Sequence, residues 1–396
     1  LSDVLSNSTG CILGFLCFFL WDIKCKIINH SSDSIRKELH VIIIGFVMFA
    51  FLISISLQWE SSLNNWDRTF PLLLGNERTG DRPWQGYVSE LFIADKAISE
   101  TEVAQVFSKM NTFDIIGRSL IASYQFTGIE NYHDERGNSP DLVWRGETRD
   151  IQQREGVLLG RNNWLETEAP AEYLTKRIVA TSQFTIGIVV ATGDTIQTGP
   201  ARIISLSEDT GHRNFTLGQS GSDLIFRLRT PFSEENGVKP ILTVPGIFST
   251  INPHNLIITY DGSALLLYVD GKLSSYSLEF NPGTVLFCSL FPQSTYSVKG
   301  YKAMHYVYSA LIFVPLGILM TLTVKIMRKQ FFIQIIINSI AILLPSLLFE
   351  GILISVSGRA IRVENLLIGM IFTISPMVFF RYIIPRTHKC FSSNKN

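Results

Sequence analysis

Long apolar runs lie near both ends of the 396-residue chain, and they restrict its folding more than any other feature. A membrane-spanning helix needs about 20 apolar residues, because the hydrocarbon core of a bilayer is roughly 30 Å thick. Five runs are candidates for such spans: 5–21, 41–57, 304–324, 331–356 and 366–380, the last extended past Arg381 by Tyr382, Ile383 and Ile384. The sequence therefore predicts a polytopic α-helical membrane domain with a water-exposed domain inserted in it.

Charge and cysteine content exclude several classes of protein. The 34 Lys and Arg residues balance the 34 Asp and Glu residues, whereas a nucleic-acid-binding protein needs a basic excess. Apolar residues make up 46% of the chain, which is too many for a disordered protein. Of the five cysteines only Cys288 lies in the middle of the chain, so the water-exposed domain is expected to hold no internal disulfide.

The distribution of Lys and Arg predicts how the spans are oriented, because basic residues concentrate in cytoplasmic loops. They gather in residues 22–40, 325–330 and 381–396, so these parts are expected inside a cell membrane. Residues 59–303 and 357–363 are then extracytoplasmic. Arg359 and Arg362 break the rule on the outer side, which indicates that a local partner holds them there.

The middle of the chain has the pattern of an all-β domain. Runs rich in Val, Ile, Phe and Tyr alternate with turn residues, for example at 184–190, 201–206, 224–229 and 256–260. Asp261-Gly262 and Asp270-Gly271 each separate two apolar runs and predict hairpins, because glycine accepts the positive φ of the turn. Many short strands of this kind predict a sandwich or jelly roll. The only helix expected here covers residues 99–107, with Ser99 and Glu102 forming a capping box.

Several spaced motifs in this region resemble the laminin-G-like (LamG), concanavalin A-like family. Residues 259–262 read Thr-Tyr-Asp-Gly, 268–271 read Tyr-Val-Asp-Gly, and 123–126 resemble the opening strand of the family. Residues 84–103 resemble its closing segment, although they come first in this chain. The resemblance implies a circularly permuted jelly-roll sandwich whose ends, near 59 and 300, lie close together. Two incomplete LamG copies are the alternative.

The apolar ends resemble the VanZ-like membrane family. The pattern is Lys302, His305 and Tyr308, then Glu350, then Arg359 nine positions later, with Asn365 where the family has an acid. Residues 2–14, with Asp3, Asn7 and a Gly-x-x-x-Gly pattern, resemble the last helix of a preceding VanZ-like unit. The resemblance implies a tandem, divided into 1–21 (last helix of that unit), 22–40 (cytoplasmic linker), 41–58 (first span of the second unit), 59–300 (LamG domain), 301–385 (three further spans) and 386–396 (cytoplasmic tail).

Counting residues places four polar groups at a similar depth near the outer leaflet: Lys302, His305, Glu350 and Arg359. Because charge inside a membrane is costly, Glu350 is expected to pair with Arg359 or Lys302. This membrane polar cluster is a candidate site for a lipid phosphate, a polyprenyl carrier or a peptide. The alternative is a salt bridge that only joins the helices.

Candidate ligand residues in the β domain have equally simple structural interpretations. Trp84, Trp144 and Trp164 are candidates for stacking on a glycan, although such tryptophans more often belong to a core. Asp134 and Asp141 are weak candidates for calcium, the only cofactor considered, and turn-capping aspartates are the commoner case. No serine-hydrolase, zinc-protease or P-loop motif occurs in the sequence.

Two hypotheses of function follow. In the first, the chain is a bacterial membrane protein that displays a lectin-like domain for a glycan or an envelope protein. The VanZ-like resemblance implies an envelope role of the glycopeptide-resistance type. In the second, it is an enzyme or transporter of envelope lipid intermediates that uses the membrane polar cluster. A non-enzymatic binding role is the preferred interpretation, since no catalytic set is recognisable.

Overall fold

The computed structural model describes residues 32–108, 111–127, 131–147, 156–290, 298–326 and 331–383. The predicted span at 5–21, its motif residues Asp3 and Asn7, and the cytoplasmic tail therefore lie outside the described residues. The chain divides into two compact units. The β unit comprises Trp59–Phe280 with Ser357–Arg359. All other described residues belong to the helical unit.

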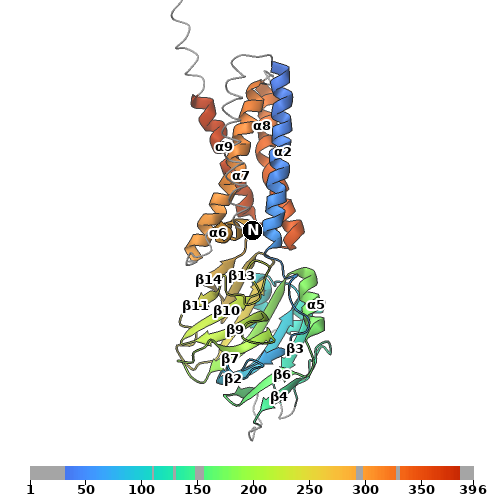
Figure 1. Ribbon diagram of the computed structural model, residues 1–396, viewed down its shortest axis with the longest axis vertical. Coiled ribbons are helices and arrows are strands. Elements are labelled where there is room, and N and C mark those ends of the chain that lie inside the picture. The colour runs from blue at the N-terminus through green and yellow to red at the C-terminus, as the bar shows by residue number, and fades with distance from the viewer. Residues whose placement is uncertain are drawn as a thin grey trace, which may run out of the picture. The chain divides into compact units, whose positions relative to one another are not determined.

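Two antiparallel seven-stranded sheets form the β unit (Figure 1). Sheet A has the order β11 (Leu242–Val244), β10 (Asp223–Leu228), β9 (Arg213–Ser220), β8 (Ala201–Ser207), β1 (Leu72–Leu74), β6 (Asn163–Thr167) and β4 (Leu142–Gly146). Sheet B has the order β14 (Lys272–Glu279), β13 (Ala264–Val269), β12 (His254–Tyr260), β7 (Phe184–Thr192), β2 (Gly86–Ala94) and β3 (Leu120–Gln125), with β5 (Val157–Leu159) paired to β2. The predicted all-β architecture is confirmed at this level.

The core between the sheets is aromatic. Phe184 of sheet B stacks on Phe215 and Phe226 of sheet A, with ring centroids 6.3 and 6.2 Å apart. Trp66 and Tyr260 extend this group, at 5.9 and 5.7 Å from Phe184. All five side chains are buried, so the two sheets share one hydrophobic core.

The first strands of the unit lie inside both sheets. β1 lies between β8 and β6, and β2 lies between β7 and β3. Residues 72–94 therefore complete the same two sheets as the later strands, and the alternative of two separate incomplete domains is wrong. The permuted order relative to a LamG domain stays a prediction.

The turn and cap predictions in the β unit are confirmed. Asp261-Gly262 joins β12 to β13, with Gly262 at φ +86°. Asp270-Gly271 joins β13 to β14, with both residues at positive φ. Helix α3 (Glu100–Phe107) begins after Ser99, whose side chain accepts from the Glu102 backbone N–H while the Glu102 carboxylate accepts from Ser99 N–H.

Three helices differ from the sequence-based prediction. α4 (Thr112–Ile116) and α5 (Glu172–Thr181) were not expected; α5 follows Ala171, which has no side chain able to cap it. The compact β unit extends to Phe280, and the domain boundary at 300 stays a prediction. Helix α6 (Pro282–Leu290) follows and packs on α7, where Gly283 lies against the backbone of Met304 and His305.

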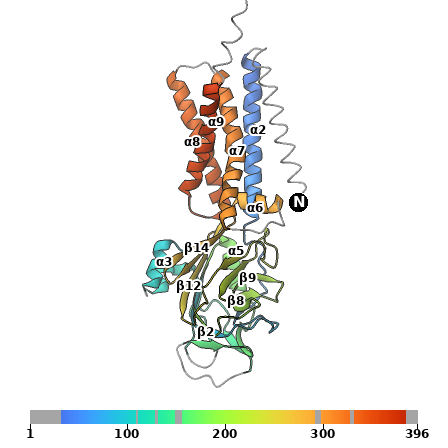
Figure 2. The ribbon, with the colours of Figure 1, turned by 90° about the vertical axis from the view of Figure 1, so that its left-hand side faces the viewer.

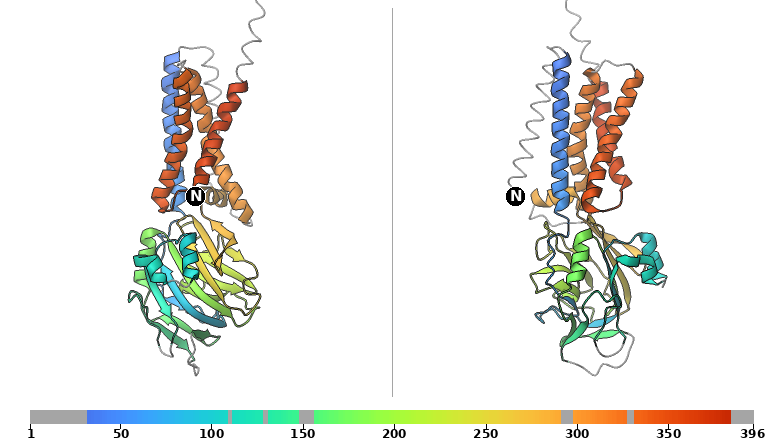
Figure 3. Two further views of the ribbon diagram at one scale, coloured as in Figure 1. Left: turned by 180° about the vertical axis from the view of Figure 1, so that it is seen from behind. Right: turned by 90° about the vertical axis from the view of Figure 1, so that its right-hand side faces the viewer.

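The described part of the helical unit contains four long helices, which run alongside one another (Figures 2 and 3). They are α2 (Ser32–Trp59), α7 (Val298–Ile326), α8 (Phe331–Ser357) and α9 (Val363–Ile383). Within the described residues, three stretches are long and apolar enough to cross a membrane: Lys37–Trp59, Ala303–Val324 and Val363–Phe380; Ile342–Ser357 is a shorter apolar stretch. Because α2 begins at Ser32, part of the predicted linker 22–40 is helical.

Close contacts hold these helices together. Gly317 of α7 faces α9 so closely that a Cβ atom there would lie 2.4 Å from the Thr373 carbonyl oxygen. The Tyr308 hydroxyl of α7 donates a hydrogen bond to the Ser54 hydroxyl of α2. Phe349 of α8 contacts Phe51 of α2, with centroids 4.4 Å apart. Small residues and interhelical hydrogen bonds of this kind are typical of helix packing in a membrane.

Candidate functional site

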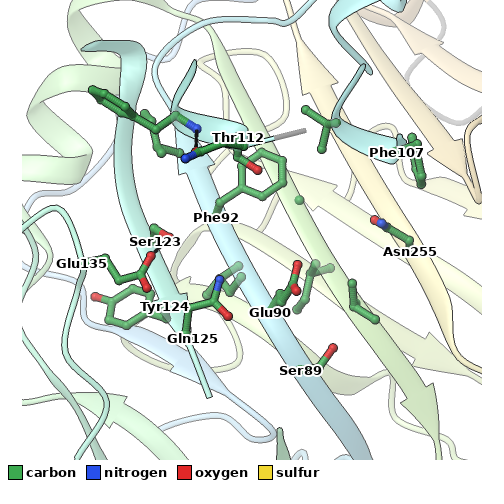
Figure 4. A pocket seen from close by; sticks show the side chains of 18 of the residues that line it. Ser89, Glu90, Phe92, Phe107, Thr112, Ser123, Tyr124, Gln125, Glu135 and Asn255 are labelled. Atoms are coloured by element: carbon green, nitrogen blue, oxygen red, sulfur yellow. Dashed lines mark hydrogen bonds between the residues drawn. The ribbon is translucent and has the colours of Figure 1, made fainter. Parts of the chain in front are cut away.

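A groove of about 940 Å³ lies on the outer face of sheet B, away from the core. Figure 4 shows its side chains rising from β2, β3 and β7, with Asn255 beyond them on β12. The residues that line it are Ser89, Glu90, Leu91, Phe92, Val106, Phe107, Asn111, Thr112, Phe113, Leu120, Ser123, Tyr124, Gln125, Glu135, Arg136, Gly187, Ile188, Val189, Pro253, His254, Asn255 and Asp270. We consider this groove the candidate site of the β unit.

Strand register determines which side chains reach the floor of the groove. Phe92 of β2 lies opposite Ser123 of β3 and Gly187 of β7. Two residues earlier in β2, Glu90 lies opposite Gln125 of β3 and Val189 of β7. Side chains on paired positions share a face, so the Phe92 ring lies beside the polar pair of Glu90 and Gln125 on the outer face of the sheet.

Gly187 leaves open the space that the Phe92 ring occupies. A Cβ atom on Gly187 would lie 2.0 Å from Phe92 Cε1, so any other residue would displace the ring. Phe92 therefore lies flat over the neighbouring strand and remains half-buried. It offers an apolar surface at the bottom of the groove.

Helices α3 and α4 form one wall of the groove. Their residues Val106, Phe107 and Ile116 pack against Ile257 and Tyr268 of sheet B. They cover one part of the outer face and leave the part with Glu90 and Gln125 exposed. The groove is the open remainder of that face.

The rim of the groove is polar and charged. Glu135 accepts a hydrogen bond from the Ser123 hydroxyl (2.8 Å), and the Arg136 guanidinium lies 4.2 Å from the centre of the Phe113 ring. At the far side, His254 Nδ1 lies 2.8 Å from Asp270 Oδ2. Exposed carboxylate and amide groups around an apolar floor can exchange hydrogen bonds with a polyhydroxylated ligand whose ring rests on the phenyl group.

The three tryptophans do not form a glycan platform. Trp84 is fully buried and its indole N–H donates to Gln219 Oε1 (2.8 Å), so the stacking prediction is wrong for this residue. Trp144 pairs with Leu165, and Trp164 pairs with Arg145. Trp144 and Arg145 are consecutive, so Trp144 and Trp164 point to opposite faces of sheet A. The structure does not bring these tryptophans together.

The weak calcium candidates are engaged in local contacts. The Asp134 carboxylate accepts four backbone N–H groups, from Ser123, Arg136, Asn138 and Ser139. This uses the oxygens that a cation would need, and it matches the turn-capping alternative. Asp141 lies 2.6 Å from His133 Nδ1. Within the described residues no group of three or more His, Cys, Asp or Glu side chains could hold a metal ion.

The membrane polar cluster is placed only in part. Glu350 is buried at the end of α8; its Oε1 accepts from the Arg362 backbone N–H (2.8 Å) and its Oε2 from the Asn365 side chain (3.0 Å). Asn365, which replaces the acid expected from the VanZ-like pattern, is thus a donor to Glu350. His305 lies half-buried in α7, and Lys302 lies three residues earlier in the same helix.

Arg359 is buried and belongs to the β unit, whereas Glu350 and His305 belong to the helical unit. The convergence of His305, Glu350 and Arg359 therefore remains a prediction. Sequence reasoning missed the pair of Arg362 N–H and Asn365 as partners of Glu350. The feature of the sequence that could have indicated these partners is the polar residue Asn365 near the start of α9.

No protein-family model, curated protein or solved structure matches the chain. The LamG-like and VanZ-like resemblances thus rest on the motifs in the sequence, and the arguments about function rest on the groove and on the helices.

Proposed function

We propose that the chain is a multi-pass membrane protein of a cell envelope whose β unit, a LamG-like sandwich outside the cell, binds a glycan in the groove on sheet B. The observation that carries the proposal is the Phe92 ring, held over Gly187 and bordered by Glu90 and Gln125. A pyranose ring offers an apolar face and a polar edge, which suits an aromatic floor beside hydrogen-bonding side chains.

The outward faces of the helices support a membrane location. On α2, Val41, Ile44 and Leu52 are 69, 63 and 61% exposed. On α9, Ile371 and Phe379 are 62 and 58% exposed. A helix in water presents polar residues on such a face, because large exposed apolar patches are unfavourable there. Lipid chains are the solvent that suits these side chains.

Replacing Phe92 with alanine is expected to weaken glycan binding about tenfold, since aromatic contacts of this kind contribute roughly 1 kcal/mol or more. Glu90→Gln and Gln125→Ala are expected to weaken it as well by removing hydrogen bonds. The measurement uses the full chain in lipid nanodiscs on an array of neutral, amino and acidic oligosaccharides, followed by titration with the strongest binder.

Glu168→Gln is the matched control, because Glu168 is an exposed acid outside the groove. It is expected to leave the affinity unchanged. Binding that survives both Phe92→Ala and Glu90→Gln would place the ligand elsewhere, and an array without any signal would remove the support for a lectin-like role.

The proposed orientation predicts which cysteines an impermeant thiol reagent reaches in intact cells. Cys25 and Cys390 are expected to resist the reagent, because they lie in segments rich in Lys and Arg that are predicted to be cytoplasmic. Cys288 is buried, so it cannot serve as the external reporter. Ser275→Cys, on an exposed position of β14, is expected to label rapidly. Labelling of Cys25 before that of residue 275 would reverse the topology.

The alternative function, chemistry on envelope lipids at the membrane polar cluster, has weaker support. Both oxygens of Glu350 accept hydrogen bonds from the start of the α9 segment. A carboxylate held in this way joins helix ends, and it is poorly placed to exchange protons with a substrate. Turnover of a lipid-linked substrate by the wild type that is lost in Glu350→Ala would favour the alternative.

A further inference from the structure

Three arginines lie on the outer face of sheet A, one on each of the strands β8, β9 and β10. Arg202 and Arg213 are 1 and 0% exposed, and Arg227 is half-buried. We call these three residues the arginine cluster. The cluster is separate from the groove on sheet B, and nothing in the proposed function uses it.

Strand register puts the cluster on one face. Arg227 of β10 lies opposite Thr216 of β9, which lies opposite Ser205 of β8. Arg213 of β9 lies opposite Ser207, beyond a register shift between Leu206 and Ser207 that interrupts the regular alternation of faces between Arg213 and Thr216. Directly opposed residues have Cβ atoms about 5 Å apart, so the guanidinium groups and the hydroxyls share a small region.

One carboxylate serves this region at close range. Glu77 is fully buried; its Oε2 lies 3.0 Å from Arg202 Nε, and its Oε1 accepts a hydrogen bond from the Ser207 hydroxyl. Arg202 also donates to the Pro200 carbonyl (2.9 Å). Glu77 therefore balances the charge of Arg202.

The other two arginines keep unused donors. Arg213 donates from Nη2 to the Thr210 carbonyl, but its Nε and Nη1 have no hydrogen-bond partner within the described residues. Arg227 Nη1 reaches Asn236 Oδ1 at 3.4 Å, and its Nε has no partner there either. The buried hydroxyl of Thr216, between Ser205 and Arg227, is likewise without a partner in the described chain.

This arrangement is unfavourable for positive charge. Burial and the neighbouring charges of Arg202 and Arg227 lower the pKa of Arg213 to about 9, although Glu77 and Asp209 act in the opposite direction. Burial and the charges of Arg202 and Arg82 lower the pKa of Arg227 to about 10. Both groups still carry a proton at pH 7, so within the arginine cluster three positive charges face the single negative charge of Glu77 at close range. Buried charges require a partner.

We propose that the arginine cluster, with Thr216, binds a tetrahedral oxyanion of the phosphate or sulfate type. Guanidinium groups bind such anions through paired N–H donors. Donors from two arginines and a hydroxyl, on neighbouring strands, suit an acceptor with oxygens in several directions. The anion is either a free ion or the ester group of a larger ligand, and the chemistry of recognition is the same for both.

The test measures the melting temperature of the full chain in nanodiscs against inorganic phosphate and sulfate, with sodium chloride at matched ionic strength. A saturable rise in melting temperature with either oxyanion is expected, because a ligand that binds only the folded state stabilises it. Arg213→Met and Arg227→Gln are expected to raise the apparent Kd at least tenfold. Arg161→Met, at an exposed turn position on another part of the unit, is expected to change nothing.

Two further comparisons separate the outcomes. Glucose 6-phosphate or a sulfated monosaccharide that binds as tightly as the inorganic ions identifies an ester as the source; binding of inorganic ions alone identifies a free ion. In chloride buffer Arg213→Met is expected to keep or raise the melting temperature, since it removes an unbalanced charge. An absent oxyanion effect in the wild type, or an effect that both variants retain, would overturn the proposal.

Discussion

Replacing Glu77 with glutamine should lower the free energy of unfolding of the β unit by about 3–5 kcal/mol. The Glu77–Arg202 pair is almost completely buried, with 0 and 1% of the side chains exposed. Glutamine has nearly the same shape, so the loss reflects charge and leaves no cavity. Removing the carboxylate leaves the Arg202 charge in the interior without its partner, and that uncompensated charge is the cause of the loss.

Urea unfolding of the full chain in detergent, followed by the fluorescence of buried Trp66 and Trp84, measures this loss. The matched control is Glu208→Gln, because Glu208 and Arg78 form an equally short pair (2.9 Å) with 46 and 48% of the side chains exposed. An exposed pair contributes at most about 1 kcal/mol. Equal losses in the two variants would contradict the assignment of a buried-pair penalty to Glu77.

The strands, the hairpins and the first cap could be predicted from the sequence because each depends on neighbours in the chain. Asp261-Gly262 needs only the positive φ of one glycine, and the capping box of α3 needs only Ser99 and Glu102. The apolar runs of α2, α7 and α9 needed no more than a count of residues. Helix α5 escaped prediction because Ala171, before its first residue, gives no capping signal.

The groove and the arginine cluster could not be predicted, because each is built by strand register between distant segments. Glu90 and Gln125 meet only because β2 pairs with β3, and Gly187 accommodates the Phe92 ring only because β2 also pairs with β7. In the sequence Gly187 is a small residue within an apolar run, and nothing there shows that it faces Phe92. Arginines at 202, 213 and 227 look like ordinary surface positions until the burial of their strands is known.

The tryptophan and aspartate candidates illustrate the same limit. A sequence shows that Trp84 is aromatic, but its burial against Gln219 depends on strand β9. The turn-capping interpretation of Asp134 needs only its own neighbours, because its carboxylate accepts from the backbone N–H groups of Arg136 and Asn138. Chemical type is visible in a sequence, whereas the face on which a side chain lies needs the partner strand.

Replacing Phe184 with alanine should lower the free energy of unfolding of the β unit by about 3–5 kcal/mol as well, but for a different reason. Its ring is fully buried and contacts the rings of Trp66, Phe215, Phe226 and Tyr260. Alanine removes the apolar surface that joins sheet B to sheet A and leaves a cavity that these four large rings cannot fill without leaving their rotamers.

The same urea titration measures the loss, and Phe184→Leu should restore part of it because leucine fills more of the space. Phe113→Ala is the control, since Phe113 is 39% exposed and contacts Arg136 only through a cation–π interaction at the edge of the groove. That interaction contributes about 0.5–1 kcal/mol at an exposed site. If Phe184→Ala costs no more than Phe113→Ala, the aromatic group is not the centre of the core and the sheets are held together elsewhere.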